Sequence, residues 1–78
     1  MRRISDNEGQ HWDVVVGRES YGMQVYLFMP VDGDGGIRKA LMAADTRLDG
    51  EQELETADSG FLQERLAMSV PWEDNALF

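Results

Sequence analysis

The pattern of apolar and polar positions near the start of the chain predicts two β-strands. In residues 11–17, Trp12, Val14 and Val16 occupy every second position, and β-branched residues dominate, as is typical of a strand. Residues 3–6 form a shorter candidate strand before it. A polar turn separates the two, and Gly9 within this turn can adopt a positive φ angle.

The segment with the strongest apolar pattern is residues 21–29. Tyr26 and Phe28 lie on one face of the predicted strand, beside Gln24. The other face carries a second set of apolar side chains at every second position: Met23, Val25, Leu27 and Met29. Because both faces are apolar, we expect this strand to be central in its sheet. Pro30 lacks a backbone N–H and favours the end of the strand.

Residues 37–43 fit either of two elements. Alanine and leucine favour a helix, which would align one set of side chains: Ile37, Leu41, Ala44 and Leu48. The glycine-rich connection before this segment favours instead a strand that pairs with residues 21–29. We expect a strand that ends near Met42.

Helix-forming residues follow, and they predict two short helices. Residues 45–57 carry only a narrow apolar stripe, and Gly50 weakens the interior of this helix by roughly 1 kcal/mol relative to alanine. Either Asp58 or Ser59 can cap a second helix over residues 61–69, because both side chains accept hydrogen bonds from free N–H groups.

Together these elements predict an α+β fold, with strands first and helices after. We expect a three- to four-stranded antiparallel sheet followed by two short helices packed on one face. Pro71 ends the second helix. Residues 1–72 form a single domain and residues 73–78 a flexible tail, while Trp72 either joins the tail or lies as a strap against the core.

Several short motifs also support a resemblance. They are the opening Asp6-x-x-Gly9-x-x-Trp12-x-Val14, the apolar strand at 25–29, the pair Leu62 and Leu66, and the ending Pro71-Trp72. In these motifs the chain resembles a group of small uncharacterised bacterial proteins. The resemblance implies strands followed by helices, and it carries no catalytic or binding residues.

The composition limits which cellular compartment and which kinds of site we expect. The 78 residues include no cysteine, so neither a disulfide framework nor a thiolate metal site is available. The first residues lack the apolar region of a signal peptide. The longest mostly apolar run, residues 23–31, is far shorter than the roughly 20 residues of a membrane helix. We therefore expect a soluble cytoplasmic protein without membrane contact.

Charge divides the chain into two unequal halves. The net charge is −8, with five basic and six acidic residues in positions 1–44, and two basic and nine acidic residues in positions 45–78. Such acidity opposes direct binding to nucleic acid. It serves solubility, or it attracts a basic partner to an acidic helix surface: Asp49, Glu51, Glu53 and Glu55.

The stretch Pro30-Val31-Asp32-Gly33-Asp34-Gly35-Gly36-Ile37 raises the question of a calcium site. An EF-hand loop that began at Asp32 would find its second carboxylate at Asp34. Its fifth position would then be Gly36, and its twelfth would be Ala43, where a bidentate glutamate is required. No lysine followed by serine or threonine comes after the glycines, which argues against a phosphate-binding loop. We expect a turn without a metal.

Catalytic chemistry finds little support in the sequence. The only histidine is His11, and no cysteine or recognisable orienting partner accompanies it, so a nucleophile and base cannot be assembled. Carboxylates two residues apart point to different sides of a helix and do not form an acid–base pair. We expect no enzyme, no cofactor and no small-molecule substrate.

Interaction with another protein, or with a second copy of the chain, remains as the predicted function. If the helices cover one face of the sheet, the other would expose Tyr26, Phe28 and Val15 as an apolar patch. An edge strand at residues 37–42 could also pair across a two-fold axis. The side chains best suited to anchor a partner are Trp12, Tyr26, Phe28 and Trp72. The alternative function is an acidic mimic of nucleic acid that inhibits or regulates a basic nucleic-acid-binding protein.

Overall fold

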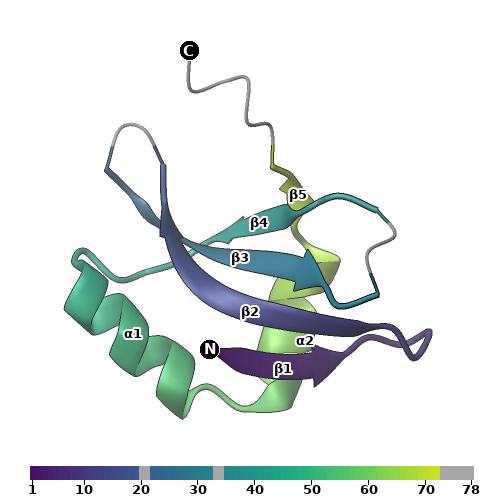
Figure 1. The fold of residues 1–78 in the computed structure, drawn as a ribbon. Helices are drawn as coiled ribbons and strands as arrows, with labels where there is room; N and C mark the ends of the chain where they lie inside the picture. Colours follow the sequence, from purple (N-terminus) through teal and green to yellow (C-terminus); the bar gives the residue numbers. More distant parts are fainter. Residues whose placement is uncertain (20–21, 33–34, 73–78) are drawn as a thin grey trace.

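The computed structural model describes residues 1–19, 22–32 and 35–72. Within them the chain forms β1 (Arg2–Ser5), β2 (His11–Arg18), β3 (Gln24–Pro30), β4 (Arg38–Leu41), α1 (Arg47–Thr56), α2 (Ser59–Ala67) and β5 (Val70–Pro71) (Figure 1). All neighbouring strands are antiparallel, so the predicted α+β class is confirmed. The predicted tail, residues 73–78, lies outside the described residues.

The sheet is a meander to which one strand is added. β1 to β4 lie side by side in chain order, and β5 returns after the helices to pair with β4 (Figure 1). The described residues thus form five strands, and the expected three to four are wrong. β5 is only two residues long, too short for an alternating pattern. Residues 37–42 do contain a strand, but β5 pairs with its first half, so the expected free edge is wrong there too.

Pro71 lies in β5 although proline cannot donate a backbone hydrogen bond. The Trp72 N–H donates to the Ile37 C=O at 2.8 Å. Because hydrogen-bonded and non-hydrogen-bonded pairs alternate along an antiparallel ladder, the neighbouring pair, Arg38 and Pro71, is of the second kind. The nitrogen of Pro71 therefore faces away from β4, where it opposes the addition of a further strand.

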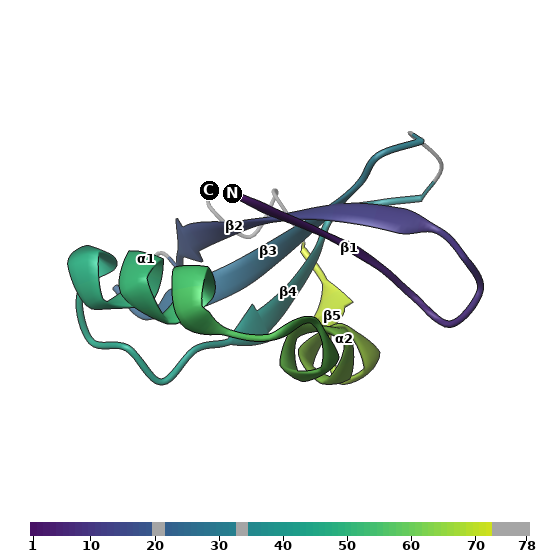
Figure 2. The ribbon, with the colours of Figure 1, turned by 90° about the horizontal axis from the view of Figure 1, so that it is seen from below.

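Both helices pack on the same face of the sheet, as predicted (Figure 2). α1 contacts β2 and β3, and α2 contacts β1 and β4. The buried side chains between the two layers form one core: Ile4, Trp12, Val14, Val16, Tyr26, Phe28, Ala40, Met42, Leu54, Leu62 and Leu66.

Side-chain caps define where each helix begins. The Thr46 hydroxyl accepts a hydrogen bond from the Asp49 N–H at 3.2 Å. The Asp58 carboxylate accepts one from the Phe61 N–H at 2.7 Å. Asp58, and not Ser59, is thus the cap of the second helix, which begins two residues before the predicted start.

Gly50 brings α1 close to the sheet. It is buried, and a Cβ atom added to it would lie 2.9 Å from Met42 Sδ and 3.2 Å from Val16 Cγ1. Real side chains rarely approach one another so closely. The glycine that weakens the helix in isolation therefore allows the helix to meet β2.

Each helix ends against an arginine of the sheet. The Arg2 guanidinium donates to the C=O groups of Leu54 at 2.8 Å and Ala57 at 2.6 Å, at the end of α1. Arg38 donates to the Oγ of Ser69 at 2.8 Å and to its C=O at 2.6 Å, just after α2. A positive charge at the carbonyl end of a helix complements the helix dipole. α1 has no basic residue of its own in its last turn, so Arg2 supplies that charge.

The helices are short relative to a bilayer. α1 has ten residues and α2 has nine, whereas a helix that spans a membrane needs about 20. In the part of the chain that the structure describes, neither helix is long and apolar enough to cross a membrane.

We expect Gly50→Val to destabilise the fold by about 2 kcal/mol, because overpacking of this kind costs roughly 1–3 kcal/mol. Urea unfolding followed by circular dichroism measures the loss. Ala67→Val, at an exposed position of α2, is the control and carries only the helix-propensity cost of about 0.5 kcal/mol. Equal losses in the two variants would contradict the tight approach at Gly50.

Arg2→Ala should lower the free energy of unfolding by about 1.5–3 kcal/mol, the range for hydrogen bonds made by a charged group. Arg3→Ala is a matched control, because the side chain of Arg3 is 58% exposed and pairs with Asp13. Such an exposed ion pair contributes little to stability, because water and salt screen it. The assignment of Arg2 to the end of α1 fails if Arg3→Ala costs as much in the same unfolding assay.

Candidate functional site

The face of the sheet opposite the helices carries an apolar surface. Figure 2 shows α1 and α2 on one side of the sheet, and no described helix on the other. Residues paired across an antiparallel sheet project from the same face, so the register identifies which side chains belong to this second side. We call it the open face, and its apolar members are Val15, Val25, Leu27, Met29, Leu41 and Val70.

Leu27 lies at the centre of the open face. It pairs with Val15 on β2, and its side chain lies over Gly17, where an added Cβ atom would be 2.6 Å from Leu27 Cγ. Val25 on the same strand is fully buried. The centre of the open face is therefore closely packed and little exposed.

The β4 end of the open face projects into solvent. Leu41 is 58% exposed and Val70 is 52% exposed. β5 pairs with Arg38 and Lys39 but not with Leu41, which leaves the outer side of Leu41 without a strand neighbour among the described residues. A cavity of about 270 Å³ lies there, lined by Glu19, Lys39, Ala40, Leu41, Met68 and Val70.

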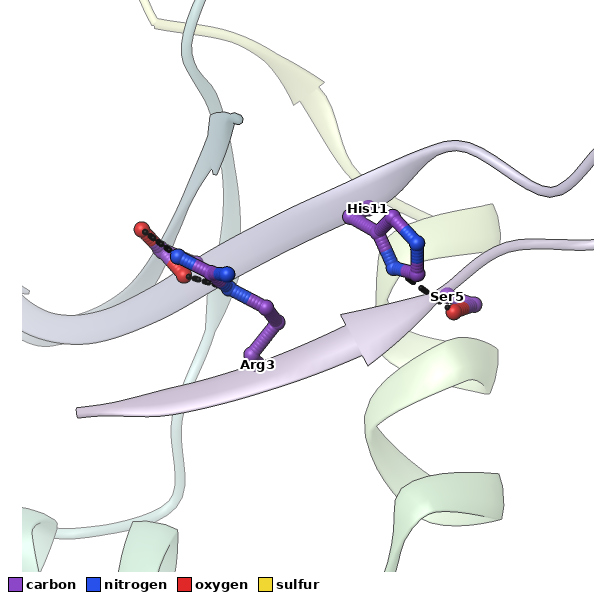
Figure 3. A network of polar contacts seen from close by, with 4 residues as sticks. Arg3, Ser5 and His11 are labelled. Carbon is purple, nitrogen blue, oxygen red and sulfur yellow. Dashed lines mark hydrogen bonds and ion pairs between the residues drawn. The ribbon is translucent and has the colours of Figure 1, made fainter. Parts of the chain in front are cut away.

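Charged side chains on the open face are paired with one another. Arg3 on β1 contacts Asp13 on β2 at 2.9 Å (Figure 3). The hydrogen bond from Arg3 lowers the pKa of the Asp13 carboxyl below its usual value. Lys39 contacts Glu19 at 2.7 Å, and its ammonium lies 5.2 Å from the centre of the Trp72 ring, in a cation–π contact. These two pairs add no net charge to the open face.

Ser5 and His11 form a further contact on the open face (Figure 3). Ser5 Oγ lies 3.0 Å from His11 Nδ1, because the two residues are directly opposite in the register. Sequence reasoning missed this contact, which only the strand pairing creates. His11 is exposed at the surface of the sheet, so the contact is a cross-strand hydrogen bond and not an activated hydroxyl in a cavity.

Tyr26 and Phe28 lie on the face opposite to that expected. Both side chains are fully buried beneath the helices, so their predicted exposure is wrong, and of the three residues only Val15 lies on the open face. The register explains the difference: Tyr26 pairs with Val16, and Phe28 pairs with Val14. Those valines point into the core, and the aromatic rings follow them. In the folded chain neither ring is accessible to a partner.

The two tryptophans occupy different surroundings. Trp12 belongs to the core, and its Nε1–H donates to Asp6 at 3.0 Å. This bond, followed by those from the N–H groups of Gln10 and Glu8, lowers the pKa of the Asp6 carboxyl. Trp12 therefore stabilises the turn between β1 and β2. Trp72 is half-buried at the edge of the open face, next to Lys39.

A cleft of about 530 Å³ lies between this turn and α2. Three of the polar side chains that line it already serve the fold. Asp6 holds the turn, Arg38 holds the end of α2, and Gln63 Nε2 donates to the Ser5 C=O at 2.6 Å. A ligand would have to break these contacts to use the same groups.

The structure divides the predicted acidic surface. Asp49 and Glu55 are exposed on α1, and Glu51 is half-buried. Glu53 instead accepts a hydrogen bond from the Tyr26 hydroxyl. One of the four carboxylates is thus engaged with the sheet.

The glycine-rich stretch between β3 and β4 lies partly outside the described residues, since Gly33 and Asp34 are not among them. Gly35 has a φ of 92°, a conformation that glycine adopts readily. Over residues 1–19, 22–32 and 35–72, no group of three or more His, Cys, Asp or Glu side chains is placed to hold a metal ion.

Comparison with known proteins gives this surface no precedent. No protein-family model matches the chain, and no curated protein or solved structure is significantly similar to it. The resemblance to small bacterial proteins therefore stays a prediction, and the function rests on the geometry of the chain itself.

We expect the fold to lose stability above about pH 10 because of Tyr26. Burial, together with the hydrogen bond to Glu53, raises the pKa of the Tyr26 hydroxyl above its ordinary value of 10.0. The folded state keeps a proton that the unfolded chain releases, so this stabilisation is complete below about pH 10 and is lost as the pH rises toward the folded pKa.

Urea unfolding of the wild type and of Tyr26→Phe, from about pH 8 to about pH 11, measures this effect. The free energy of unfolding of Tyr26→Phe should decline less steeply above about pH 10. Parallel declines in the two proteins would show that another group causes the loss.

Proposed function

We propose that the protein is a small non-catalytic interaction module that binds a partner protein through the open face. The solvent side of an antiparallel sheet usually alternates polar residues with the inward apolar ones. Here Val15, Leu27, Met29 and Leu41 occupy positions where polar side chains are typical. Leu41 and Val70 are each more than half exposed, and exposed apolar side chains that gather on one face are typical of a binding site.

Trp72 supports the same surface as a binding site. Of the four side chains predicted to anchor a partner, it is the one that lies at the open face, where it contacts Lys39. Tryptophan contributes strongly to interfaces because its large ring buries much area while the indole N–H remains able to donate. A partner that covered Leu27 and Leu41 would also reach this ring.

The acidic mimic remains the second proposal, and the helix layer supports it. Residues 45–72 hold seven acidic and two basic side chains. Asp49 and Glu55 are exposed on α1 and point to solvent rather than to the sheet. This acidic surface and the open face lie on opposite sides of the molecule, so the two proposals can be tested independently.

Capture of partners from a lysate of the protein's own cells, by the tagged protein, tests both proposals. We expect Leu41→Glu to abolish capture, because it places a charge on the open face. Leu48→Glu is the matched control: it makes the same change at a leucine that is 69% exposed on α1. Capture should survive about 0.5 M salt, where exposed charges are largely screened.

Two other results would argue against binding through the open face. If Asp49→Asn with Glu55→Gln abolishes capture, and Leu41→Glu does not, the acidic mimic is favoured. If neither change alters what is captured, the open face does not bind another protein.

A further inference from the structure

We infer that the open face binds a second copy of the chain, so that two sheets pack face to face with the helices outermost. This inference rests on the proposed function, because it names the partner of that same surface. Its support comes from three properties of the described residues: the distribution of charge, the protection of the strand edges and the shape of the open face.

The distribution of charge favours the open face over the helix layer as the surface that contacts a second copy. Two molecules of net charge −8 repel each other overall. The acidic residues of the helix layer would oppose one another in any contact made through α1. The open face, in contrast, carries Arg3 with Asp13 and Lys39 with Glu19. Each pair is neutral, so these described side chains bring no like-charge repulsion to a contact between two open faces.

The face-to-face arrangement also separates the acidic layers. Each molecule is 18 Å deep along its thinnest axis, and facing sheets pack about 10 Å apart. The two helix layers would thus lie on the outer sides, separated by both sheets. That separation is well beyond the Debye length of about 8–10 Å at physiological salt, so the acidic helices add little repulsion.

The strand edges are less suited than the open face to self-association. At the β5 edge, Pro71 turns its nitrogen outward and offers no N–H to another strand. At the β1 edge, Gln63 donates to the Ser5 C=O at 2.6 Å. An added strand would therefore lack a donor N–H at Pro71 and would find the C=O of Ser5 already hydrogen-bonded.

The shape of the open face permits a symmetric contact. Leu41 and Val70 are more than half exposed at the β4 end, whereas Leu27 is half-buried and packs over Gly17 at the centre. A two-fold axis parallel to the strands can place the exposed end of each copy over the closely packed centre of the other. Such an isologous contact closes on itself and stops at two copies.

The size of the open face predicts a weak dimer. The strands of the described chain contain 25 residues, and each covers about 16 Å² of a sheet, which gives a footprint of roughly 400 Å² per copy. Stable interfaces bury about 800 Å² per partner. We therefore expect a monomer–dimer equilibrium that depends on protein concentration.

Sedimentation equilibrium of the purified chain, from about 10 to about 500 µM, tests the inference in the range of weak affinities. We expect a dimer to form as the concentration rises. Leu41→Glu and Val70→Glu should each raise its dissociation constant about tenfold or more, because each places a charge in an apolar contact. Leu48→Glu should leave it unchanged, and circular dichroism verifies that all three variants are folded.

The salt dependence of the dimer is an independent test. Because the contact is apolar and its charges are paired, raising the salt from about 0.05 to about 0.5 M should leave the dimer unchanged or strengthen it. A dimer that dissociates at high salt would overturn the inference, since charged surfaces would then hold it together.

The remaining outcomes separate this inference from the proposed function. A monomer at every concentration overturns the inference of a dimer. If Leu41→Glu still abolishes capture of another protein, the proposed binding of a partner by the open face stands. A dimer whose dissociation constant is unchanged by Leu41→Glu and Val70→Glu also overturns the inference, because its contact then lies elsewhere. If the chain is a monomer and Leu41→Glu does not change what it captures, both the dimer and the proposed partner binding are wrong.

Discussion

Two arginine side chains hold the carbonyl ends of both helices against the sheet, and the arrangement of the molecule depends on them. Arg2 and Arg38 lie in one cross-strand row, with Val14 and Phe28 between them. The two central members of the row are fully buried. Because one row projects from one face, both helices end on that face, and no helix of the described residues covers the opposite face.

This arrangement separates the chemistry of the two sides. The helix layer holds the exposed carboxylates of Asp49 and Glu55, while the open face holds apolar side chains and charge pairs such as Arg3 with Asp13. In the proposed dimer, the acidic helix layers lie outermost and the open faces, whose charged side chains are paired, make the contact.

Much of the fold could be predicted from short-range patterns. Alternation marked β2 and β3, Asp58 was one of two predicted caps, and the helix formers marked α1 and α2. The candidate site was harder to predict, because residues 21–29 are apolar on both faces and alternation alone cannot say which face turns inward. The valines of β2 carry the missing information: Val14 and Val16 belong to one face, and pairing with them draws Phe28 and Tyr26 into the core.

By itself, the sequence determined the α+β class, the first three strands, both helices and the excess of acid in the second half, because propensity, capping and charge are local properties. Only the tertiary structure decided which face of β3 is buried, that β5 returns to β4, and that Arg2 meets the end of α1. Those features depend on contacts between residues far apart in the chain; Arg2 and Leu54, for example, are separated by 52 positions. No local pattern encodes such a contact, since its free energy arises only when the strands are in register and both layers are packed.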